Sequence, residues 1–231
     1  MAIAYDSFLP DILPYARNCP DPTIEAAIRL AVIELCEKTD IWQVDLDPIS
    51  AIAEQYAYDL EPPSQSTVQR IVSITDVNGE RLEPVTTGML DQRSPDWRNQ
   101  PGNPRFYIRQ DEENQIWLAP PPSVARTNAF LLRVVLKPSI TSTSCSNFIM
   151  TDFRDAICNR TIARLLSMPD RDWSNFKTAA VHYSMWERQV VDIEKQARQA
   201  NEGVTPVVRY GGIGVRRGQR NPYDSRRTRF I

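Results

Sequence analysis

The sequence has a single histidine, His182, among 231 residues, and this scarcity restricts the chemistry open to it. A catalytic triad or a histidine-based metal site would need His182 together with partner residues, and none is evident beside it. The motifs GxSxG and HExxH, the phosphate-binding P-loop and the dinucleotide-binding GxGxxG are also missing. We therefore expect His182, which lies in a helical pattern, to be a partly exposed helix residue or a hydrogen-bonded packing residue.

Cysteine is also scarce, and no pair of cysteines has CxxC spacing. The four cysteines are Cys19, Cys36, Cys145 and Cys158. Cys36 and Cys158 lie within apolar helical patterns, for which buried free thiols are the expected state. Free thiols fit a protein made in a reducing cytoplasm.

Long apolar runs are absent, because no stretch approaches the roughly 20 residues that span a bilayer. The first residues, MAIAYDSFLPDILPYARNCP, have no basic start and include Asp6 and Asp11. They therefore do not resemble a secretion signal. We expect no membrane contact, and no motif indicates a cofactor or a metal.

Paired carboxylates are the remaining enzymatic option. Asp45 and Asp47, or the run Asp111, Glu112 and Glu113, could in principle serve as acid and base. Both clusters resemble polar turns near strand ends, so we interpret them as solvated loops. Two carboxylates that are far apart in the chain but close together in the fold cannot be identified from the sequence. A hydrolase acting on cell-wall or capsule polymers therefore remains an alternative.

Positive charge is concentrated at the C-terminus. The chain has 27 basic and 29 acidic residues, with 42% hydrophobic and 24% charged residues, an ordinary globular composition. Residues 203–231 contain seven arginines, no lysine and one acid, Asp224, and so carry a net charge of +6. The remaining 20 basic and 28 acidic residues give residues 1–202 a net charge of −8. This asymmetry indicates an interaction tail on a body with another role.

Helical periodicity appears at both ends of residues 1–202. Asp21 and Pro22 suit the cap and first turn of a helix that runs to about Trp42. A second helix is expected from Thr151 or Asp152 to Met168, and the longest from Asp172 to Gly203, where apolar residues recur at steps of three or four. The side chains expected in the helical core or in a ring interface are Ile28, Leu35, Trp42, Phe153, Ile157, Leu165, Trp173, Phe176, Tyr183, Trp186 and Val190.

Alternating apolar residues and turn signals fill the region between these helices. Strands are expected at VQRIVSITDV, RFYIR, NQIWLA and AFLLRVVLK, and Asn78-Gly79 predicts a tight hairpin turn. The sequence thus predicts an α+β fold: an α-helical bundle domain with an inserted small antiparallel β domain and an extended C-terminal tail. The expected boundaries are 1–43, 44–138, 139–202 and 203–231.

The segment 203–231 is rich in glycine and arginine and has too few apolar residues for a core of its own. It could bind nucleic acid, with Tyr210, Tyr223 and Phe230 stacking on bases. It could instead bind a protein groove, with valines as apolar anchors and arginines paired with carboxylates. We favour the protein groove, because an acidic body repels nucleic acid. A solvated tail without function is the third alternative.

Two segments carry a resemblance to a known family: AAIRLAVIELCEKTDIWQ, residues 26–43, and TIARLLSMPDRDWSN, residues 161–175. With the order of elements, they resemble bacteriophage head-to-tail adaptor proteins of the connector or tail tubular protein A type. The resemblance extends over nearly the whole chain, although the C-terminal tail is only generally similar.

The resemblance implies a structural virion protein and not an enzyme. Such subunits form a ring, usually of twelve copies, beneath the portal protein, and DNA passes through it. The β domain faces outward or toward a downstream tail or nozzle protein, and the C-terminal segment docks on the portal. In this sequence the expected portal-binding residues are Arg209, Tyr210, Arg216, Arg217, Arg220, Tyr223, Arg226, Arg227, Arg229 and Phe230.

Overall fold

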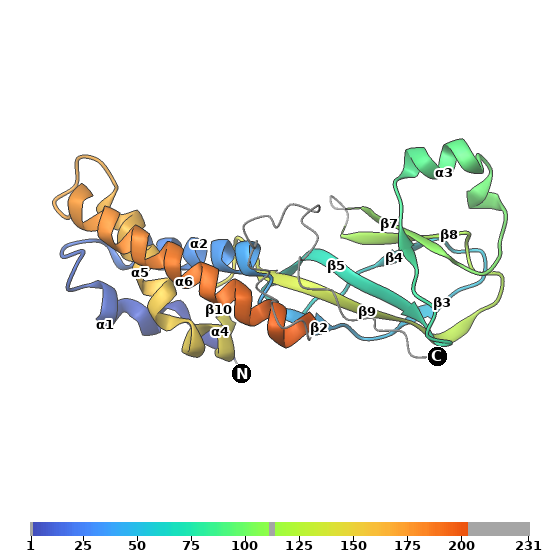
Figure 1. The fold of residues 1–231 in the computed structure, drawn as a ribbon, viewed down its shortest axis with the longest axis horizontal. Coiled ribbons are helices and arrows are strands. Elements are labelled where there is room, and N and C mark those ends of the chain that lie inside the picture. Colours follow the sequence, from blue (N-terminus) through green and yellow to red (C-terminus); the bar gives the residue numbers. More distant parts are fainter. Residues whose placement is uncertain (1, 111–113, 203–231) are drawn as a thin grey trace, which may run out of the picture.

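The computed structural model describes residues 2–110 and 114–202, and it is elongated, with most of the helices at one end and the two larger sheets at the other (Figure 1). The described residues form six α-helices and three small sheets. This confirms the α+β fold class. The element order also follows the prediction, since one helical segment precedes the strands and the two long helices follow them.

The helix α2, Asp21–Thr39, starts and stops on local signals. Pro22 lies in its first turn, where a missing N–H is harmless. The N-cap residue is Pro20, and Asp21 is an acid of the first turn and not the cap, so the capping prediction was wrong. Asp40 ends the helix in the left-handed conformation (φ 51°), and its backbone N–H donates to the carbonyl of Cys36.

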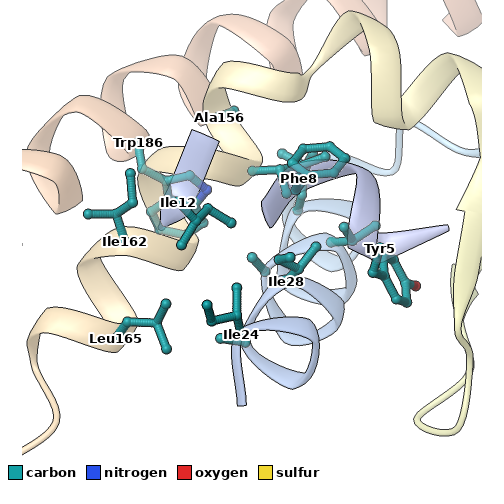
Figure 2. Packing of buried hydrophobic residues seen from close by; sticks show 14 of the residues in the cluster. Tyr5, Phe8, Ile12, Ile24, Ile28, Ala156, Ile162, Leu165 and Trp186 are labelled. Atoms are coloured by element: carbon teal, nitrogen blue, oxygen red, sulfur yellow. The ribbon is translucent and has the colours of Figure 1, made fainter. Parts of the chain in front are cut away.

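Three helices build the main core, because each carries an apolar face that it cannot bury alone. Helix α2 packs against α5, Arg154–Leu166, and α6, Phe176–Glu202, although the strands separate them in the chain. Figure 2 shows Ile28 of α2, Ile162 of α5 and Trp186 of α6 around one cluster. The expected packing of the helices across the inserted strands is therefore observed.

The N-terminal residues complete this core. They form β1, Ala2–Ala4, a 3₁₀ turn at Tyr5–Phe8 and α1, Leu9–Ile12. Strand β1 pairs antiparallel with β10, Ser144–Ser146, a pairing that local patterns did not predict. A short helix, α4, Asn147–Asp152, then precedes α5, whose N-cap is Phe153. Thr151 and Asp152 therefore lie inside α4 and do not cap α5.

Two long antiparallel strands form the backbone of the β part. They are β5, Ser66–Asp76, and β9, Arg126–Pro138. The shorter strands β2, Gln43–Asp45, and β3, Ile49–Ala51, also pair with β9. The other sheet consists of β4, Ala57–Asp59, β8, Gln115–Ala119, β7, Phe106–Gln110, and β6, Glu83–Pro84. The strand pairings of this part are antiparallel, as predicted, except that β6 pairs parallel to β7.

The predicted hairpin turn is present, but its second strand is not. Gly79 has φ 83° and donates its N–H to the carbonyl of Asp76. After one bridge between Thr75 and Arg81, the chain leaves β5 and enters the other sheet as β6. The following segment forms α3, Thr87–Arg93, whose N-cap Thr86 accepts a hydrogen bond from the N–H of Met89.

Trp42 lies at the junction of the two parts and packs against both the helical cluster and the main β cluster. Charged contacts add to this junction. Asp40 accepts hydrogen bonds from Arg70 of β5, the shorter at 2.6 Å, and Lys137 of β9 lies 2.5 Å from Glu37.

Candidate functional site

The side chains expected in the core or in a ring interface fall into three groups of exposure. Ile28, Leu35, Ile157, Leu165, Trp186 and Val190 are buried. Trp42, Phe153 and Trp173 are partly buried and pack on the core. Phe176 is 63% exposed and Tyr183 is 37% exposed, so both lie outside the core of this chain.

Trp186 is buried between cations at the centre of the three-helix packing. The Lys38 ammonium lies 4.3 Å and the Arg160 guanidinium 4.9 Å from its ring centroid. Glu34 binds both cations, Arg160 at 2.6 Å and Lys38 at 3.4 Å, and it also accepts from Arg164. Burial tends to raise the pKa of Glu34, but the hydrogen bond and charge of Arg160, with those of Lys38, lower it overall. This cluster fixes the helices and has no reactive geometry.

Helix α6 carries most of the exposed apolar side chains of the described helical part. They are Phe176, Val181, Tyr183, Met185 and Val191. Between Phe176 and Trp186, the only residues with an acidic or basic side chain other than the phenol of Tyr183 are Lys177 and His182. Exposed apolar groups gathered on one element mark a contact surface more often than scattered ones do.

His182 is a packing residue at the edge of this surface, as predicted. Its Nδ1 lies 2.8 Å from the side-chain oxygen of Asn159, and its ring makes an edge contact with Tyr15 at 5.1 Å. Burial lowers the pKa of His182, which favours the neutral imidazole.

Of the candidate carboxylates, Asp45 and Asp47 lie within the described residues, and they do not form an acid–base pair. Asp45 makes a 2.7 Å ion pair with Arg133, and the hydrogen bond from that guanidinium lowers the pKa of Asp45. Asp47 lines a different feature, an open cavity of about 280 Å³ with Asp59 and Glu61. Asp111, Glu112 and Glu113 lie outside the described residues, and across the described ranges no group of three His, Cys, Asp or Glu residues is arranged to hold a metal.

The comparison with protein families decides between the remaining alternatives. The family model described as "SU10 adaptor protein" matches residues 3–210, which is nearly the whole chain. The chain belongs to the SU10 adaptor family. It is therefore a phage head-to-tail adaptor, a structural virion component. No curated protein matches the chain.

Membership of a structural adaptor family removes the hydrolase alternative, since the SU10 adaptors are not an enzyme family. All four cysteines of this adaptor are free thiols. Cys36 is buried, as predicted, and Cys158 is partly exposed. Within the described residues, no helix is long and apolar enough to cross a membrane.

The predicted portal-binding residues of the adaptor, from Arg209 to Phe230, lie outside the described residues. The helix that leads to them ends at the junction of the two parts (Figure 1). There, Glu194 and Arg198 of α6 line an open cavity of about 250 Å³ together with Lys38, Asp40 and Arg70. Sequence reasoning missed the exposed apolar side chains of α6. The spacing of Lys177, Val181 and Met185, each four residues after the last, indicated that they share one side of the helix.

Proposed function

We propose that this adaptor forms a ring of about twelve copies beneath the portal protein, with DNA passing through the ring. Its C-terminal segment, residues 203–231, docks on the portal. The observation that carries the proposal is the charge separation within a chain of an adaptor family. A segment of net charge +6 follows a body of net charge −8.

Arginine suits this docking role better than lysine. The guanidinium group makes two parallel hydrogen bonds to one carboxylate, which an ammonium group cannot do. Seven arginines and no lysine in residues 203–231 therefore favour an acidic groove on a protein partner. Repetition of the same contact around a ring converts a modest affinity into firm attachment.

The elongated body supports a connecting role. We propose that residues 44–138 form a domain inserted into a helical domain made of 1–43 and 139–202. The β domain then reaches the downstream tail or nozzle protein, while the helical domain surrounds the channel. Figure 1 shows the helical core and the two larger sheets at opposite ends of the long axis, so each end could contact a different partner.

The negative body has a consequence for DNA passage. We propose that the acidic residues of 1–202 give the channel a negative wall, so that DNA slides without adhering. A map of the assembled neck tests this directly. A neutral or basic channel surface would rule it out.

Truncation after Glu202 tests the docking role. The shortened chain should keep the melting temperature and circular dichroism of the full chain, but it should fail to bind purified portal in sedimentation or pull-down. A matched chain with all seven tail arginines changed to lysine keeps the charge and should bind weakly.

Two outcomes would contradict the proposal. Normal loading of the truncated chain onto portals would remove the role of the tail. A salt-dependent affinity for DNA that disappears on truncation, without any loss of portal binding, would instead favour nucleic acid as the partner.

A further inference from the structure

Strand β2 has a free edge within the described residues. It pairs antiparallel with β9 and lies at the end of the strand order of its sheet. The N–H of Leu136 in β9 donates to the carbonyl of Trp42, and the N–H of Leu46 donates back to β9. Because the bonds of an antiparallel pair alternate along a strand, the backbone groups of Gln43 and Asp45 point away from β9. No loop or side chain of the described part bonds to them.

The end of α6 lies beside the start of this free edge. Gln43 lines the open cavity of about 250 Å³ at the junction together with Ala197 and Arg198 of α6. Figure 1 shows α6 running toward the β part, with its last turns near β2. Since three extended residues span about 10 Å, the chain that follows Glu202 starts within reach of β2.

The residues that follow α6 have the composition of a short edge strand. After Gly203 comes VTPVV, residues 204–208, which is β-branched except for its central proline. β-Branched residues are enriched in strands, and proline is tolerated at the edge of a sheet. The match to the SU10 adaptor family extends to residue 210, so it includes this segment and leaves out residues 211–231, where most tail arginines lie.

Pro206 determines which side of the segment can face β2. It has no N–H, so it suits a position that points away from β2, and the N–H groups of Thr205 and Val207 then point toward β2. These two donors are two residues apart, and so are Gln43 and Asp45. The proline on the outer side also discourages the addition of another strand.

We propose that residues 204–208 add to the free edge of β2 in the same chain, as a parallel strand held by main-chain hydrogen bonds. The direction is parallel because α6 approaches from the helical part and β2 leads away from it. The carbonyl of Thr205 then accepts from the N–H of Asp45, and the N–H of Thr205 donates to the carbonyl of Gln43. This strand anchors the base of the C-terminal segment at the junction and leaves the arginine-rich residues after it for a partner.

Hydrogen exchange of the Asp45 amide in the purified chain tests the added strand. Exchange should be at least about tenfold slower in the full chain than in a chain that ends at Glu202, because only the full chain can bond this amide. A chain that ends at Val208 should keep the protection, although it lacks every tail arginine. The amide of Val44, which faces β9, is the internal control and should exchange equally slowly in all three chains.

Two proline substitutions in the full chain test the register. Thr205→Pro should remove the protection of Asp45, because it deletes an N–H that faces β2 and places the ring against that strand. Val208→Pro is the matched control, since the N–H at this position points away from β2, and it should leave the protection unchanged. Both positions follow α6, and circular dichroism shows whether the helices are retained.

The outcomes separate this inference from the proposed function. Equal exchange of the Asp45 amide in the full chain and in the chain that ends at Glu202, or equal effects of the two prolines, would overturn the added strand and leave portal docking intact. Protection that falls on dilution would assign the strand to a second copy and would also overturn the inference. Normal portal binding by the chain that ends at Val208 would instead overturn the proposed docking function.

Discussion

At the residue scale, the Glu34 cluster shows how this chain uses charge for structure. A carboxylate with 21% side-chain exposure contacts Arg160, Arg164 and Lys38, and two of these cations flank the ring of Trp186. Removal of one charged side chain from such a partly buried set leaves the charges of the other side chains uncompensated. The residues therefore act as a unit that joins α2, α5 and α6.

Glu34→Gln should lower the free energy of unfolding at pH 7 by about 1–2 kcal/mol. The lowered pKa of folded Glu34 means that its stabilisation is present above the unfolded pKa of about 4.3 and is lost as pH falls through the folded value. Denaturant titrations at pH 7 and pH 3 measure this. Glu187→Gln, at an exposed position of α6, is the control and should change little. If Glu34→Gln lowered the free energy of unfolding by the same amount at pH 7 and at pH 3, the role of the charge would be contradicted.

At the element scale, short signals decide where secondary structure starts, turns and ends. Asn78-Gly79 turns the chain because glycine adopts positive φ without steric cost, and Thr86 caps α3 through its side-chain oxygen. These are local interactions, so they form regardless of which sheet the chain enters next. The path of the chain after this turn, away from β5, instead depends on the pairing of β6 with β7 in the other sheet.

Gly79→Ala should destabilise the protein by about 1 kcal/mol, because the added Cβ disfavours φ 83° while meeting no atom within 4 Å. Gly88→Ala is the matched control: Gly88 lies in α3 and also has open space around it. There alanine should be neutral or stabilising by up to about 1 kcal/mol, since it favours helix. Thermal melts of both variants test the pair, and equal effects would argue against backbone conformation as the cause.

At the scale of the whole molecule, Trp42 links two hydrophobic clusters. It packs on the helical cluster and on the β cluster, and the N–H of Leu136 in β9 donates to its carbonyl. A single side chain shared by both clusters ties the stability of the two parts together. This coupling suits a body that must hold its two ends in a defined relation.

Trp42→Ala should cost about 3 kcal/mol and should lower hydrogen-exchange protection in both α5 and β9. Trp97→Ala is the control, because Trp97 is buried in a separate small cluster beside α3. It should lower protection in β7 and β8 and spare α5. If Trp42→Ala affected only one part, the proposed coupling would be wrong.

Sequence reasoning reached the α+β class and the family resemblance because both depend on periodicity and on the order of elements along the chain. It placed the long helix within a few residues of α6 but assigned Phe176 and Tyr183 to the same face as Trp186. A spacing of three or four residues covers a wide arc of a helix. Only the positions of α2 and α5 show which part of that arc is buried.

The sequence by itself determined the three long helices, the turn at Gly79, the separation of charge and the adaptor family, because each is a property of neighbouring or summed residues. Only the tertiary structure decided that β1 pairs with β10, that β6 runs parallel to β7 and that Val181 and Met185 stay exposed. Such pairings and exposures depend on residues that are far apart in the chain. Many partners have compatible local patterns, and packing selects one of them.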